Sequence, residues 1–218
     1  MRTGRPRSFD VKVALDRAME VFWRKGYEGS SLSDLTSAMG INPPSLYAAF
    51  GSKEGLFRAV LDRYDEKRRE FQDRVFSAPT AREVAQRFLE GAADFASDPK
   101  NLPGCLLVSS ALSCSDDAVP REVARHRALK ESALKERFQR AQKEGDLPKS
   151  ADAGALARYV MTVANGLAVQ AGAGAAEAEL REVARLAITA WPAGETRSEA
   201  HRSAKAPRRA AKRGTVAA

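Results

Sequence analysis

The 218-residue chain has few of the residues that build metal and disulfide sites. It contains two cysteines, Cys105 and Cys114, and two histidines, His126 and His201. Two cysteines are too few for a disulfide scaffold. At these spacings the four side chains do not form a plausible zinc site. We therefore expect neither a metal nor a cofactor.

Long apolar runs are also absent. No run reaches the ~18–20 residues that a membrane-spanning helix needs. The basic N-terminus is not followed by the apolar segment of a secretory leader. These absences favour a soluble, cytoplasmic protein with no membrane partner.

Charge is present but unevenly distributed. The net charge of +8 divides into +3 over residues 1–70, zero over residues 71–191 and +5 over residues 192–218. Basic ends on a neutral body indicate a polyanionic partner, because cationic segments displace counterions from phosphates. Charge alone fits DNA, RNA or a membrane surface equally well.

Helical periodicity recurs along the chain and strand patterns do not, so we predict an all-α fold with about nine helices and short connections. The predicted helices are residues 11–25, 32–39, 43–50, 53–76, 81–97, a short one from 105, then 118–144, 153–171 and 177–191. The predicted domains are a basic flexible arm (1–9), a helix-turn-helix domain (10–60), a ligand-binding and dimerisation domain (61–191) and a basic tail (192–218). The tail has few large apolar residues, which is typical of disorder.

The second and third predicted helices have a helix-turn-helix pattern. Ser31 and Asp34 form a capping box, Gly40 ends the second helix, and Asn42 caps a third helix with Pro43 at its first position. The apolar positions that can face the first helix are Leu32, Leu35, Met39, Ile41, Leu46 and Phe50. Small and polar residues remain outward, as close approach to a DNA groove requires.

These residues carry a family resemblance. Residues 14–61, above all 22–27 (FWRKGY) and 45–57 (SLYAAFGSKEGLF), resemble the DNA-binding domain of the TetR family of repressors and cover about a quarter of the chain. The resemblance implies a transcriptional repressor, not an enzyme. Such a repressor binds a palindromic double-stranded DNA operator as a homodimer and is released by a small-molecule effector. Carried over by position, the DNA face comprises Ser31, Ser33, Pro43, Pro44, Ser45, Tyr47 and Lys53.

This recognition helix departs from many relatives. It has no arginine, glutamine or histidine between Pro43 and Phe50, so we expect weak bidentate base readout. Specificity would then depend on Ser33, Ser45, methyl contacts from Ala48 or Pro44, and DNA shape.

Both basic ends have two interpretations. The N-terminal Gly-Arg-Pro-Arg sequence places Arg5 and Arg7 on an extended arm suited to a narrow minor groove. The alternative is an ordinary solvated terminus. The C-terminal tail is either a solvated tail or a phosphate-binding arm.

An effector cavity would be lined by the inner faces of the middle helices. The candidate lining residues are Tyr64, Phe88, Phe95, Leu106, Ser109, Leu112, Phe138, Tyr159 and Thr162. The alternative is plain core packing, which aromatic residues at helical spacing usually mean. Because charges in this region balance, no cluster predicts an anionic or a cationic effector.

Cys105 follows a Pro-Gly step at the predicted start of a helix, where the helix dipole favours a thiolate. Some TetR-like regulators have a similar Gly-Cys-Leu step and respond there to electrophiles or oxidants. The alternative is a buried structural cysteine. Cys114 lies nine positions on, too far along one short helix to pair with Cys105.

The last two predicted helices suit dimerisation. An apolar stripe runs along residues 180–191, and small residues at 164, 167, 168 and 171 allow close helix packing. They could instead pack only within the core of the monomer, but the family resemblance favours a dimer.

Two other functional classes are alternatives to a repressor. One is a cysteine-dependent enzyme, for which only His126 is available as a base, and the other is a non-specific architectural nucleic-acid binder.

Overall fold

The computed structural model describes residues 9–110 and 118–192. Arg5, Arg7, Leu112, Cys114 and the basic tail lie outside these ranges. The described part holds ten helices and no strand. They are α1 (Val11–Gly29), α2 (Leu32–Met39), α3 (Pro43–Phe50), α4 (Lys53–Lys67), α5 (Arg69–Phe76), α6 (Ala81–Ser97), α7 (Leu106–Ser109), α8 (Ala118–Glu144), α9 (Ala153–Gly172) and α10 (Glu177–Thr189). The all-α prediction is confirmed.

Local capping explains where the first helices begin and end. The Asp10 carboxylate accepts hydrogen bonds from the backbone amides of Lys12 and Val13, and Asn42 accepts one from Ser45. Gly40 takes the left-handed conformation that ends α2, with φ 69° and ψ 32°. The prediction that the first regular helical run ends at Gly26 is confirmed in part. Gly26 leaves helical geometry, with φ 69° and ψ 177°, and a short helical turn then continues as far as Gly29.

The predicted helix from Ser52 to Phe76 is two helices, which explains why ten are found where nine were predicted. The break falls at Arg68, where φ is −98° and ψ is 0°. No glycine or proline marks this position. Its guanidinium instead lies 3.8 Å from the centre of the Phe95 ring on α6, a tertiary contact that the local sequence does not contain.

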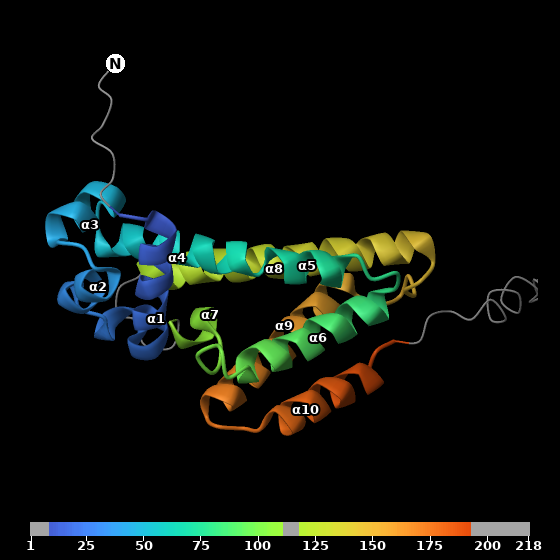
Figure 1. Cartoon of the computed structure of the whole chain (residues 1–218). Coiled ribbons are helices and arrows are strands. Elements are labelled where there is room, and N and C mark those ends of the chain that lie inside the picture. Colours follow the sequence, from blue (N-terminus) through green and yellow to red (C-terminus); the bar gives the residue numbers. More distant parts are fainter. Residues whose placement is uncertain (1–8, 111–117, 193–218) are drawn as a thin grey trace, which may run out of the picture.

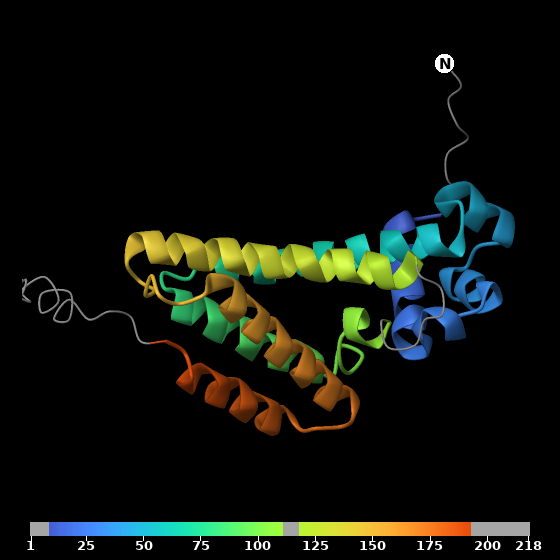
Figure 2. The same cartoon turned by 180° about the vertical axis from the view of Figure 1, so that it is seen from behind.

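The helices form two packed layers and a separate group at the N-terminal end (Figures 1 and 2). Helices α1, α2 and α3 occupy one end, and α8 runs from there along α4 and α5. Helices α6, α9 and α10 pack together as the second layer, with α10 at its outer edge. None of the described helices is long and apolar enough to span a membrane.

The core of the N-terminal end extends beyond the predicted boundary at residue 60. Val60, Leu61 and Tyr64 of α4 are buried in the same cluster as the side chains of α1 and α2. Leu106 of α7 and Val123 of α8 belong to this cluster too. Helix α1 contacts α7, and α4 contacts α8, which brings the middle of the chain into contact with its N-terminal end.

Candidate nucleic-acid interface and effector cavity

Helices α2 and α3 present most of the predicted DNA face to solvent. Ser31, Ser33, Pro43, Pro44 and Tyr47 are exposed, and Ser45 is half-buried. Tyr47 is 49% exposed although it is aromatic, so its ring and hydroxyl are accessible to a partner. The inward face holds the buried Leu35, Met39 and Leu46.

Ser31 has a structural task as well as an exposed position. Its hydroxyl accepts a hydrogen bond from the Asp34 amide at 3.0 Å and donates one to the Asp34 carboxylate at 2.8 Å. A hydrogen bond from Lys25 of α1, followed by those from Ser31, lowers the pKa of Asp34 to about 2. Asp34 thus ties the start of α2 to α1, a link that the sequence prediction missed.

Lys53 lies at the first position of α4, close to the DNA face. Its ammonium group sits 4.5 Å from the centre of the Tyr27 ring, which itself stacks on Phe22 at 5.9 Å. The Tyr27 ring therefore fixes the position of this cation beside the N-terminal amides of α4, where a phosphate oxygen binds well.

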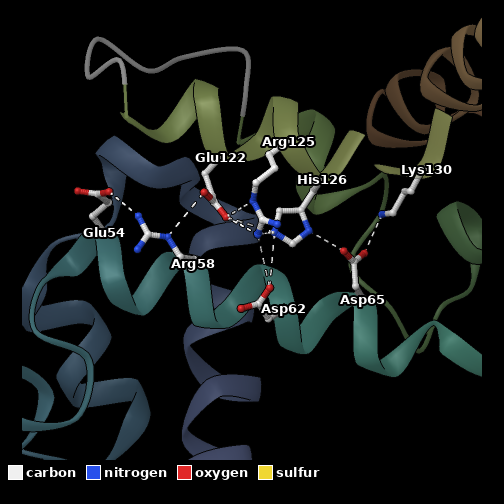
Figure 3. A network of polar contacts seen from close by, with 8 residues as sticks. All are labelled: Glu54, Arg58, Asp62, Asp65, Glu122, Arg125, His126 and Lys130. Carbon is white, nitrogen blue, oxygen red and sulfur yellow. Dashed lines mark hydrogen bonds and ion pairs between the residues drawn. The ribbon is translucent and has the colours of Figure 1, made fainter. Parts of the chain in front are cut away.

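A polar network joins α4 to α8 (Figure 3). His126 is 3% exposed, and its Nδ1 lies 2.6 Å from the Asp65 carboxylate. Lys130 lies 2.8 Å from the other oxygen of Asp65. Burial raises the pKa of Asp65, but the hydrogen bonds from His126 and Lys130 outweigh it and leave that pKa below its usual value.

The same network continues toward the DNA-facing end of α4. Arg58 of α4 pairs with Glu54 at 2.9 Å and lies 3.6 Å from Glu122 of α8. Charged groups thus link α8 to the helix that begins at Lys53 (Figure 3). From the sequence, His126 is a candidate only for a base; its structural role is not evident there, because its partner Asp65 is about sixty residues away.

A cavity of about 60 Å³ lies between α4, α6, α8 and α9. Three of the predicted lining residues meet there, Tyr64, Phe88 and Phe95, together with the predicted sensor Cys105. Its other lining residues include Arg68, Phe71, Gln72, Arg127, Lys130, Met161 and Asn165.

Five other predicted lining residues lie elsewhere, which corrects that part of the prediction. Leu106 is buried in the core of the N-terminal end, and Ser109 is half-buried on α7. Phe138 packs edge-on against Trp191 at 5.1 Å. The Tyr159 hydroxyl donates to the Ala187 carbonyl at 2.8 Å, and Thr162 is exposed. Helical periodicity marks an inner face but not which neighbour covers it.

Cys105 lines this cavity beside a buried phenol. Its sulfur lies 3.3 Å from the Tyr64 hydroxyl, a hydrogen bond in which either group can donate. Burial, and then the neighbouring Cys105, raise the pKa of Tyr64 well above 10.0, so its phenol stays protonated at neutral pH. Helix α7 has only four residues, so the helix-dipole argument for a thiolate loses most of its basis.

The cavity is also more cationic than its sequence region suggested. Three basic side chains line it, Arg68, Arg127 and Lys130, and none of its described lining residues is acidic. The fold thus brings together a group of cations that the charge balance of residues 71–191 did not indicate. Charge balance along the chain does not determine which charges the fold brings together.

Trp23 connects the N-terminal end to this cavity and was also missed. Its indole nitrogen donates to the Pro103 carbonyl at 3.2 Å, in the loop before Cys105. Its ring lies 5.5 Å from that of Tyr64 and 5.9 Å from that of Phe95, both of which line the cavity. A change in either ring would therefore act directly on α1.

The second layer exposes apolar side chains on two neighbouring helices. Val169 of α9 is 48% exposed, and Val183 and Leu186 of α10 are 49% and 52% exposed. Helices α9 and α10 are in contact. They are the two helices in which the sequence predicts a dimer interface.

Comparison with known proteins identifies relatives of the chain over most of its length. Residues 14–60 match the profile of bacterial regulatory proteins of the tetR family. The HTH-type transcriptional repressor ComR of Escherichia coli (strain K12) is 35% identical over 195 residues, which cover 87% of this chain and 92% of ComR. The repressor BdcR of the same organism is 52% identical over 61 residues, or 28% of this chain and 31% of BdcR.

Among solved structures, a cysteine mutant of the TetR family transcriptional regulator CifR has a closely similar fold. That protein was complexed with 26-bp double-strand operator DNA. It is 42% identical, with a TM-score of 0.82, over 86% of this chain and 100% of that chain.

Proposed function

The chain belongs to the TetR family of bacterial transcription regulators, and we propose that it represses transcription by binding a palindromic double-stranded operator as a homodimer. We further propose that a small molecule or a thiol-reactive compound releases it by entering the cavity beside Cys105. The observation that carries the proposal is the contact between the exposed helix-turn-helix end and that cavity. Trp23 of α1 donates to the Pro103 carbonyl and packs against Tyr64, which lines the cavity. We also propose a cytoplasmic location, because the protein would meet its operator there.

Recognition would combine phosphate contacts with DNA shape. Ser33, Pro43, Pro44 and Tyr47 offer a small, exposed surface, and Lys53 offers a cation held against Tyr27. Helix α3 contains no arginine or glutamine that could hydrogen-bond to a base edge. The relatives named above as repressors, and an operator complex of a 42% identical regulator, support DNA as the partner.

A regulatory role fits the surroundings of Cys105 better than catalysis does. The sulfur has a neutral phenol beside it. His126, the described histidine, is engaged by Asp65 instead. A nucleophilic enzyme needs a base next to its thiol.

Removal of the Tyr47 ring tests the DNA interface. We expect Tyr47→Ala to weaken binding to the operator and to random DNA alike, by roughly 1–3 kcal/mol, because a phosphate contact positions the protein without reading sequence. Fluorescence anisotropy with both DNAs measures this. Tyr47→Phe is the matched control that removes only the hydroxyl. Unchanged affinity in Tyr47→Ala would exclude the side chain from the interface.

Alkylation of Cys105 tests the thiol-reactive route. We expect N-ethylmaleimide to release the protein from DNA, because an adduct cannot fit a cavity of about 60 Å³ without displacing its walls. Cys105→Ser should stay bound under the same treatment, and Cys114→Ser should behave like the parent. Release of Cys105→Ser by the reagent would rule out this route and leave a non-covalent effector.

A further inference from the structure

Two guanidinium groups line the cavity without an acidic partner among the described residues. Arg127 donates from Nη2 to the Leu107 carbonyl at 3.1 Å, while its buried Nε has no hydrogen-bond partner in the described structure. Arg68 lies 3.8 Å from the centre of the Phe95 ring and 5.3 Å from that of Phe71. No ion pair joins either guanidinium to a described carboxylate.

The third cation is already compensated. Lys130 lies 2.8 Å from Asp65, whose other oxygen is held by His126. The uncompensated positive charge of the cavity therefore belongs to Arg68 and Arg127. Both side chains are half-buried. Withdrawing a cation from water without a counter-charge is costly, so a bound anion would be favoured here.

The remaining walls are apolar. Phe71, Phe88, Phe95 and Met161 line the cavity together with small residues of α6 and α9. Such walls favour a flat apolar body over a second polar group. The lining thus combines two arginine side chains that can bind an anion with aromatic walls that can contact an apolar group.

The cavity must enlarge to accept such a ligand. About 60 Å³ holds only a few water molecules, whereas small-molecule sites usually measure roughly 300–1,000 Å³. An outer groove of about 550 Å³ shares Arg68, Phe71 and Phe95 with the cavity, so these three side chains separate the two spaces. The Phe71 ring lies so close to α6 that a Cβ on Gly91 would come within 2.1 Å of it.

We propose that the effector is a compact organic monocarboxylate whose anionic group pairs with Arg127 and Arg68 and whose apolar body lies among Phe71, Phe88 and Phe95. This inference rests on the proposed function, since it names the ligand class of the proposed effector site. The ligand joins the cavity to the outer groove by turning Arg68 and Phe71 aside. Arg68 is the residue at which α4 ends and α5 begins, so its displacement acts on the helix that starts at Lys53.

Matched acids and amides test the proposal. Benzoate, phenylacetate and 2-naphthoate are titrated into the full-length protein by calorimetry, each beside its neutral amide. We expect at least one acid to bind roughly tenfold to a hundredfold more tightly than its amide, because the charged hydrogen bonds to the guanidinium groups are lost in the amide. The same acid should lower operator affinity in an anisotropy assay.

Substitution of Arg127 tests whether this side chain causes the preference for the acid over its amide. Arg127→Met should abolish the discrimination between acid and amide while leaving the melting temperature of the free protein unchanged or higher, because a half-buried cation with an unpartnered buried Nε is removed. Arg68→Met should weaken acid binding as well. Arg140→Met is the matched control, on the same helix but with a side chain 59% exposed and outside the cavity.

The outcomes separate this inference from the proposed function. If no acid binds more tightly than its amide, or if Arg127→Met keeps the full preference, the inference is wrong. Operator binding without any ligand is measured in the same anisotropy assay. Failure of that binding would contradict the proposed repressor itself, whereas normal DNA binding without acid preference would contradict only the ligand class.

Discussion

Truncation of Leu46 to alanine is expected to abolish operator binding at protein concentrations that saturate the parent. Among the α3 residues, all of which the structure describes, Leu46 is the one buried side chain. Removing a fully buried leucine side chain costs roughly 2–5 kcal/mol, and here it removes the main anchor of the recognition helix. Alanine preserves helix propensity, so the effect reports on docking rather than helix formation.

Leu147→Ala is the matched control for this result. Leu147 is 2% exposed, in the other core cluster, between α8 and α9. It should lower the free energy of unfolding by a similar amount in urea titrations while operator affinity, measured well below the melting temperature, stays near that of the parent. If Leu46→Ala binds operator as tightly as Leu147→Ala does, α3 is not the recognition helix.

Placing a carboxylate on the exposed apolar face of α10 is expected to convert the protein to a monomer. Leu186 is 52% exposed beside Val183, an arrangement that a two-fold partner would cover. Leu186→Asp would bury an unpaired charge at that interface. Because one chain then contacts only one half-site, operator affinity should fall by at least roughly a hundredfold.

Light scattering after size-exclusion chromatography measures the mass, and anisotropy measures the affinity. Leu129→Asp is the matched control, because Leu129 is 56% exposed on α8, outside the proposed interface. A dimer that survives Leu186→Asp and also a Val183→Asp/Leu186→Asp double variant would exclude this face of α10 as the subunit contact.

Local signals made much of the fold predictable. The Asp10, Ser31, Asn42, Ser52 and Thr80 side chains all cap helices as their positions indicate. Each cap needs only residues within three positions, so the sequence contains the whole signal. The DNA face can be predicted from the sequence for the same reason, since a glycine turn and an apolar stripe determine which side of α3 points outward.

The effector cavity was less predictable because its residues meet only in the tertiary structure. Arg68 and Arg127 are far apart in sequence, so no local pattern shows that they face the same space. The sequence shows Trp23 only as part of the 22–27 segment that resembles the TetR family, and its contacts with Tyr64 and Phe95 arise only in the folded chain. Phe138 has the expected spacing for a lining residue, but Trp191 covers it.

These contacts provide two physical routes from the cavity to the DNA face. Trp23 joins Tyr64 and Phe95 to α1. The Asp65–His126 and Arg58–Glu122 contacts join α8 to α4, which begins at Lys53 (Figure 3). A ligand that moves either α4 or the Trp23 ring therefore changes the placement of the DNA face, which is what effector-controlled release requires.

Hydroxyl-radical footprinting of the full-length protein on a fragment selected from genomic DNA tests the central claim most directly. A dimeric repressor should give two protected blocks related by two-fold symmetry, with centres one helical turn of DNA, ~34 Å, or a whole multiple apart. A single protected block bound by one chain would contradict a dimeric, operator-specific repressor. Uniform protection of every fragment, without sequence preference, would contradict it too.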